Sequence, residues 1–330
     1  MSYKPAVGPA SERTAAIANG TRAWLSSLLE KSDDRTEASV NNLCHILVAS
    51  WICDAVLSES ASATFPEIAR HVARLLNASE GPDCLGDLKP TLRLIVEILF
   101  SSQGLDAGPF RQFFNQSVSL LKRLDPARDP DLALADKRTL LHHAGILPPP
   151  KSPFADSLPM SPDRFRLSAS SGEVEALTFQ LEYLTGWGTQ PVNAGLIEPW
   201  LGEFVGGLVV HRLRNYDLIS AARLLRLHGY LAASGITSRR EDLYDAFCIH
   251  CQPRGPFGWY GPESAALRQA SPCMREEMEF YLVTTLECLW TLAERSGRWR
   301  LFAAIPHWVA PGHLAGAQRR EQEVLVSARH

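Results

Sequence analysis

The sequence predicts an all-α protein. Across most of its 330 residues, apolar side chains recur at intervals of three and four, the spacing that places them on one side of a helix. Stretches in which apolar and polar residues alternate between turn signals, as they do in half-buried strands, are missing. Several helical stretches are apolar on more than one side, which indicates that other helices cover them.

The expected helices follow one another closely along the chain. In "TRAWLSSLLEK" the side chains of Trp24, Leu25, Leu28 and Leu29 share one face. The next stretch, "VNNLCHILVASWICDAVL", is apolar over a wider arc. The predicted helices cover roughly residues 21–31, 40–57, 65–77, 88–103, 108–124, 131–145, 172–187, 195–213, 216–233, 238–252 and 274–295.

A proline-rich segment, "LPPPKSPFADSLPMSPDRF", separates the two halves of the chain. Proline lacks the backbone N–H that a helix needs, so this segment is expected to be extended. It is either a surface linker or a flap over a pocket, anchored by Phe154, Met160 and Phe165. The predicted organisation is an N-terminal helical half (1–146), a connector (147–166) and a C-terminal helical half (167–330) within one continuous domain.

Two helical stretches favour a particular architecture. "YDLISAARLLRLHGYLAASG" and "MEFYLVTTLECLWTLAE" are each apolar around much of their circumference. Such helices suit an inner layer that is covered by an outer layer. The sequence therefore predicts antiparallel helical hairpins that form a complete or partial α/α toroid.

Composition argues against several classes of function. The net charge of −3 and the absence of a basic stripe argue against nucleic-acid binding. No secretory signal and no window of 18 apolar residues is present, so no membrane partner is expected. Seven dispersed cysteines in a chain of this size are typical of reduced thiols in the cytoplasm. The oligomeric state is not encoded in any recognisable pattern.

Three segments of the second half carry a resemblance. They are "EALTFQLEYLTGWG", "NYDLISAARLLRLHGYLAASG" and "CQPRGPFGWYGPE", in this order. Together they resemble a group of actinobacterial all-helical proteins that are encoded beside natural-product genes. The third is also similar to the glycine-aromatic turn that opens inner helices in terpenoid-cyclase-like α/α toroids. The resemblance covers about 90 residues and implies a helical protein of natural-product biosynthesis, including antibiotic biosynthesis.

The chain departs from these patterns at the positions that would carry chemistry. The resembling group has a histidine where this chain has Phe179, and commonly an aspartate where it has Gly186. Neither D-x-D-D nor D-D-x-x-D occurs, so the acidic residues of terpene cyclisation are missing. The resemblance therefore does not imply isoprenoid cyclisation.

Cys248, His250 and Cys251 form a compact group of metal-ligand residue types. A tetrahedral zinc site needs about four ligands, and a second C-x-x-C pair to complete it is missing. Three residues apart on a helix, the two cysteines share a face while His250 points elsewhere. Buried free thiols are favoured over zinc, and neither a metal nor another cofactor is expected.

Four ionisable residues are acid/base candidates. His142, at the end of a predicted helix, either caps that helix or shuttles protons at the rim of a pocket. Asp217 lies where a helix begins, which also fits a capping role. Glu182 lies among apolar residues and faces either a polar cavity or solvent, and Glu263 closes the glycine-rich turn. We expect catalysis, if the chain is an enzyme, to use these four groups.

Aromatic residues supply the expected walls of a binding site. Trp259 and Tyr260 are bracketed by glycines, and together with Glu263 they suit an apolar substrate with a basic or developing cationic group. The same rings fit a wedge in the core between hairpins. Phe179 and Trp187 are the other predicted substrate contacts.

Two functions stay open at this point. One is a biosynthetic protein that binds a mostly apolar small molecule in a central helical cavity, as a cofactor-independent cyclase- or lyase-like enzyme. The other is a non-catalytic module whose helical surface binds a peptide, a carrier protein or a biosynthetic partner. The apolar replacements at Phe179 and Gly186 favour the second. Inward-facing ionisable groups in a closed cavity would favour the first.

Overall fold

The structure is a computed structural model, and it describes residues 9–31, 40–57, 64–78, 89–105, 108–124, 134–149, 170–192, 197–198, 200–251, 255–258, 274–295 and 300–308. The all-α prediction is confirmed over these residues, since only an isolated bridge between Cys251 and Phe257 has β geometry. The helices are α1 (Pro9–Lys31), α2 (Val40–Val56), α3 (Thr64–Ala78), α4 (Pro90–Ser102), α5 (Gly108–Arg123), α6 (Ala135–His143), α8 (Ser171–Leu184), α9 (Trp200–Arg214), α10 (Leu218–Ala233), α11 (Glu241–Cys248), α13 (Met274–Arg295) and α14 (Leu301–Ala304).

The helix ends follow from local chemistry. Ser170 and Glu173 form a capping box at the start of α8, and Pro90 occupies the first turn of α4, where a missing N–H costs nothing. Helix α8 stops at Leu184, three residues earlier than predicted, because residues 186–188 all have positive φ. Trp187 is thus in a left-handed turn beyond the helix and not in its last turn.

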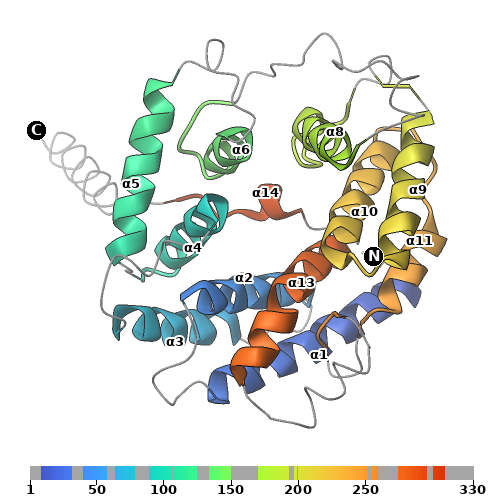
Figure 1. Cartoon of the computed structure of the whole chain (residues 1–330). Helices are drawn as coiled ribbons and strands as arrows, with labels where there is room; N and C mark the ends of the chain where they lie inside the picture. Colours follow the sequence, from blue (N-terminus) through green and yellow to red (C-terminus); the bar gives the residue numbers. More distant parts are fainter. Residues whose placement is uncertain are drawn as a thin grey trace, which may run out of the picture.

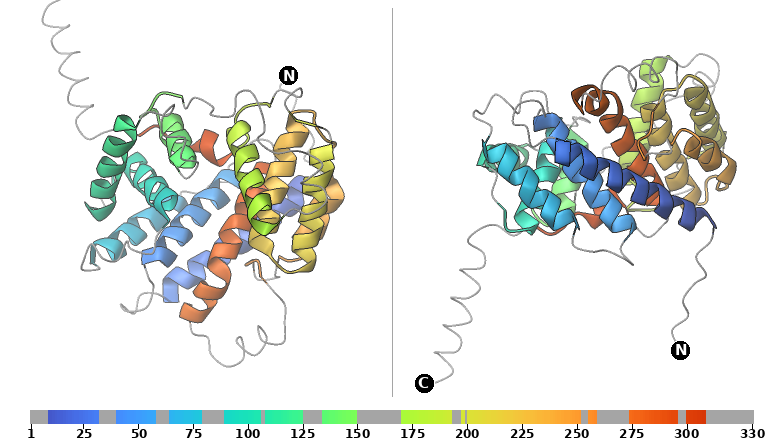
Figure 2. Two further views of the ribbon diagram at one scale, coloured as in Figure 1. Left: turned by 45° about the horizontal axis from the view of Figure 1, so that its top comes forward. Right: turned by 90° about the horizontal axis from the view of Figure 1, so that it is seen from below.

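The helices are arranged around α14 (Figure 1), which lies in the middle of the view. Helices α2 to α6 occupy one side and α8 to α11 the other, while α13 runs between them and α1 passes along the lower edge toward α11. In both views of Figure 2, α1 lies against α2 and α13, the two helices on which it packs. Within the described ranges, none of the helices combines the length and hydropathy needed to cross a membrane.

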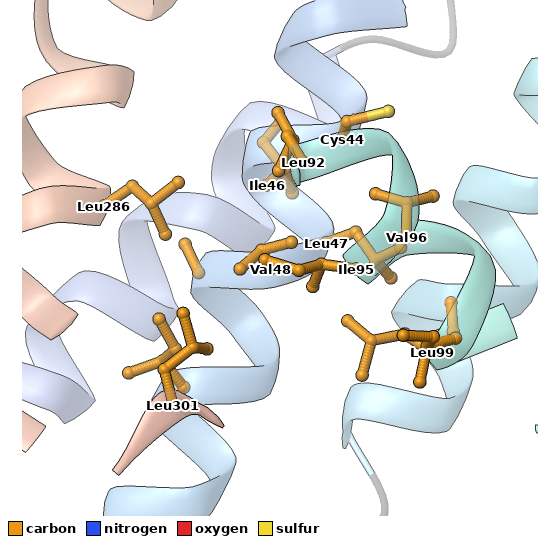
Figure 3. Packing of buried hydrophobic residues seen from close by; sticks show 14 of the residues in the cluster. Cys44, Ile46, Leu47, Val48, Leu92, Ile95, Val96, Leu99, Leu286 and Leu301 are labelled. Atoms are coloured by element: carbon orange, nitrogen blue, oxygen red, sulfur yellow. The ribbon is translucent and has the colours of Figure 1, made fainter. Parts of the chain in front are cut away.

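Helix α13 separates two hydrophobic cores. On one side, Leu286 and Leu289 join the core of α1 to α6. On the other side, Cys288 and Leu292 join the core of α8 to α11. Figure 3 shows Leu286 of α13 on the side of α2 opposite to α4. A helix between two cores must be apolar on two faces, which is the pattern its sequence displays.

The last described segment, residues 300–308, packs between the two sides of the fold. Its Phe302 ring lies 5.2 Å from the ring of Trp187, centroid to centroid, and is buried. Farther along, the backbone N–H of Trp308 donates to the carbonyl of Ala144 at 3.1 Å. The Trp308 ring also stacks on Phe114 at 4.9 Å. This segment thereby ties α5 and α6 to the turn that follows α8.

The turn after α11 docks on α1. The Thr21 hydroxyl of α1 donates to the Gly255 carbonyl at 2.7 Å, and at Gly255 φ is +103°. A side chain at Gly255 would collide with the backbone of Gly20, so only glycine fits there. Helix α11 ends at Cys248, four residues before the predicted end, because the chain turns back to form the Cys251–Phe257 bridge.

Candidate functional site

A row of polar side chains, which we call the ladder, lies on one side of the otherwise mostly apolar helix α10 and pairs with neighbouring helices. Arg223, Arg226 and Tyr230 lie three and four residues apart, so they project from the same side of the helix. Arg223 donates to both carboxylate oxygens of Glu182 on α8, at 2.8 and 2.6 Å. Tyr230 donates its hydroxyl to the Glu294 carboxylate on α13.

Arg226 is the most completely satisfied member of this ladder. Its guanidinium donates to the Glu287 carboxylate at 2.9 Å and to the Thr291 hydroxyl at 3.0 Å. It also stacks over the Trp290 ring at 3.9 Å. Burial, the largest single influence, lowers the pKa of Arg226, but Glu287 and the other nearby acidic groups together outweigh it and raise the pKa. Arg226 therefore carries a permanent positive charge in the interior.

A cavity of about 270 Å³ opens at one end of the ladder, between α10, α11, α13 and the start of the 300–308 segment. Helix α10 contributes five of its residues and α13 contributes three. The lining residues are Arg226, Gly229, Tyr230, Ala232, Ala233, Arg239, Tyr244, Thr291, Glu294, Arg295 and Arg300.

Four of these lining residues are arginines. Arg295 pairs with Glu241 and lies over the Tyr244 ring at 4.3 Å. Arg239 donates to the backbone carbonyl of Arg295. The pKa of Arg295 is lowered, mainly by burial and to a smaller extent by the neighbouring positive charge of Arg239. Like charges that lie close together disfavour the charged form of each other.

Two groups in the wall of the cavity lack a hydrogen-bonding or ionic partner among the described residues. The Arg300 guanidinium contacts the face of the Tyr230 ring at 5.3 Å, but no described carboxylate pairs with it. The Tyr244 hydroxyl likewise has no hydrogen bond to any described group. Gly229 makes room for that hydroxyl, since a Cβ there would lie 3.1 Å from it. Burial raises the pKa of Tyr244 to about 12, so the hydroxyl keeps its proton and can donate.

The charges of the cavity do not cancel. The positive charges are those of the four lining arginines. The negative charges are those of the lining Glu294 and of Glu287 and Glu241, which pair with lining arginines but do not line the cavity themselves. Among the described residues this leaves one positive charge in excess, and two when Glu294 is protonated. A cavity with such an excess and unpartnered donors can attract and hold an anion.

A second cavity of about 270 Å³ lies near the N-terminal end of α10, and its charges are already matched. Its two arginines, Arg212 and Arg223, pair with Asp217 and Glu182. Glu175 adds a further negative charge to its wall. We therefore place the candidate site at the first cavity, between α10, α11 and α13.

The predicted acid/base residues have structural partners in the fold. Glu182 is buried and holds Arg223, and it lines neither of the two cavities described above. Asp217 caps α10, accepting from the Ser220 N–H at 3.1 Å, and also pairs with Arg212. His142 lies in the last turn of α6, with its Nδ1 3.2 Å from the Leu147 carbonyl oxygen. The structure does not bring these three residues together in one of these cavities.

The predicted aromatic walls divide into two groups. Trp187 is buried with Phe179, Tyr183 and Phe302 around it, so its ring packs in the core. Phe179 lies edge-on to Trp187 and beneath the Arg223 guanidinium at 5.9 Å. Trp259, Tyr260 and Glu263 lie outside the described residues.

Sequence reasoning missed the arginines and tyrosines of the cavity. A signal was present in "ARLLRLHGY", where Arg223, Arg226 and Tyr230 interrupt an apolar helix at helical spacing. Such residues are seldom buried unless they are paired, so their spacing indicates partners on a neighbouring helix. Arg300 and Tyr244 have no comparable signal, because only the tertiary fold brings them to α10.

The thiols of the glycine-rich turn are protonated. Burial raises the pKa of Cys248, and it raises the pKa of Cys251 to about 12. In the part of the chain that the structure describes, His, Cys, Asp and Glu side chains nowhere form a group of three that could hold a metal ion.

Comparison with known proteins adds no relative: the chain matches no protein-family model, no curated protein and no solved structure.

Proposed function

We propose that this chain binds a small organic anion, with a carboxylate or a phosphate group, in the arginine-lined cavity between α10, α11 and α13. The observation that supports this most is the unpartnered pair of donors, Arg300 and Tyr244, beside three further arginines. Guanidinium and hydroxyl groups are the donors that recognise carboxylate and phosphate oxygens.

The size of the cavity limits the ligand. A cavity of about 150 Å³ holds benzene. The 270 Å³ between α10, α11 and α13 therefore suits a molecule somewhat larger than benzene, such as a one-ring acid or a sugar phosphate. The mostly apolar ligand expected from the sequence is replaced in this proposal by one with an anionic head group.

The proposal keeps the setting that the resemblance implies, natural-product biosynthesis by a helical protein of partial α/α toroid architecture. It does not require catalysis, so it applies to a cofactor-independent enzyme and to a binding module alike. Glu182, His142 and Asp217 stay predictions as acid/base residues, and the partners just described give each of them a structural role.

Exchanging Arg300 for methionine tests the proposal. Arg300→Met keeps an aliphatic side chain over Tyr230 and removes the unpaired charge. A charged hydrogen bond contributes about 1.5–3 kcal/mol, so we expect benzoate and inorganic phosphate to bind roughly ten- to a hundred-fold more weakly. Isothermal titration calorimetry at low ionic strength measures both affinities, because salt screens such contacts.

Arg74→Met is the matched control, since it removes one exposed arginine from α3, away from the cavity. The proposal is rejected if neither anion binds the wild-type chain. It is also rejected if the Arg74 and Arg300 variants weaken binding equally, because the anion would then respond only to overall charge.

A further inference from the structure

Among the described residues that line the cavity, Glu294 is the one that carries a carboxylate. It is buried and accepts three hydrogen bonds. The Trp290 indole N–H donates at 2.6 Å, the Leu301 backbone N–H donates at 3.1 Å, and the Tyr230 hydroxyl donates to the other carboxylate oxygen. These contacts fix the carboxyl group within the cavity in which we place the anion.

The charged and titratable groups around Glu294 come from every packed element. Helix α10 contributes Arg226 and Tyr230, α11 contributes Tyr244, and the segment that begins at residue 300 contributes Arg300. Arg239 lies before α11, and Arg295 follows Glu294 on α13. None of these groups changes its charge between weakly acidic and weakly alkaline pH, since all are arginines or tyrosines. The two carboxylates next to the wall, Glu287 and Glu241, are each paired with an arginine, and Glu294 forms no ion pair among the described residues. Glu294 is therefore the group that we expect to respond to pH.

We propose that the anion binds together with one proton, which Glu294 takes up from solvent; this inference rests on the proposed function. Two negative charges inside one cavity repel each other strongly, because little water screens them there. The proton joins the Glu294 oxygen that faces Tyr230, and the resulting O–H donates to the tyrosine oxygen. The Tyr230 O–H is thereby released and turns to donate to the anion. No bond other than these hydrogen bonds changes.

The direction of the pH effect follows from the burial of Glu294. Burial raises the pKa of Glu294 above its ordinary value, against the opposing effects of Arg226 and the three donors. The carboxyl group is neutral below this raised pKa and charged above it. Anion binding is therefore strongest at low pH and weakens as the pH rises through the pKa of Glu294.

Glu294→Gln separates this inference from a general effect of pH. We expect wild-type affinity for benzoate, which stays ionised throughout, to fall roughly ten-fold or more between about pH 5.5 and about pH 8. The glutamine variant should bind at the higher pH at least as tightly as the wild type does at the lower, with little pH dependence. Glu67→Gln, which removes an exposed carboxylate from α3, should keep the wild-type profile.

Proton uptake by the wild-type chain gives a second measurement that needs no variant. Titrating benzoate in buffers with different ionisation heats should reveal up to one proton taken up per ligand bound. Benzoate binding with no proton uptake and no pH dependence would overturn the role of Glu294 and leave the anion site intact. Failure of both benzoate and inorganic phosphate to bind at either pH would instead reject the proposed function itself.

Discussion

Replacing Phe302 with alanine is expected to lower the free energy of unfolding by about 3–5 kcal/mol, the usual cost of emptying a buried aromatic position. The Phe302 side chain is 1% exposed and lies 5.2 Å from the Trp187 ring and 6.3 Å from the Trp290 ring. Its loss leaves a hole where the 300–308 segment meets the end of α8 and the side of α13. Urea unfolding followed by circular dichroism measures the change.

Leu120→Ala serves as the control for this variant. The Leu120 side chain is 54% exposed on α5, so its truncation should change the stability by less than about 0.5 kcal/mol. Equal stability of the Phe302 variant and the wild type would show that the 300–308 segment does not pack between the two sides of the fold.

The second large effect is expected at Glu182. Glu182→Ala leaves the Arg223 guanidinium without its carboxylate in a largely buried position, which costs about 3–5 kcal/mol for a fully buried pair. Because the Arg223 side chain is 29% exposed, water offsets part of this penalty, and we expect about 2–4 kcal/mol. Chemical denaturation at neutral pH measures the loss.

Glu175→Ala is the matched control on the same helix, because Glu175 is exposed. It should be within about 0.5 kcal/mol of the wild type. If Glu182→Ala were as stable as Glu175→Ala, the ion pair with Arg223 would not be structural, and a catalytic role for Glu182 would gain support.

Helix positions were predictable from the sequence because apolar spacing and capping residues act locally. Met274–Arg295 forms α13 over the predicted range, and Ser170 caps α8 where its pattern begins. The predicted helix ends were wrong where the backbone leaves the helical conformation for a reason that apolar spacing does not encode, such as the positive φ of Trp187. The packing of residues 300–308 was not predictable, since Trp308 meets Ala144 and Ser101 only through the tertiary fold.

The candidate site was harder to predict than the fold. The sequence predicts Glu182 and Asp217 as acid/base candidates, and in the structure each of them pairs with an arginine. The cavity instead gathers Arg226, Tyr244 and Arg300 from three separate elements. Arginine in a sequence is usually taken as exposed. The gathering of four arginines around one cavity therefore becomes visible only when the helices are assembled.

The most direct test of the central claim, that an organic anion occupies the cavity between α10, α11 and α13, is X-ray diffraction from crystals soaked with para-bromobenzoate. Anomalous scattering locates the bromine independently of the protein. We predict a bromine peak inside the cavity, with the carboxylate on Arg300 and the Tyr244 hydroxyl. Bromine only at other positions, or no bound bromine in crystals whose cavity is open to solvent, would contradict the claim.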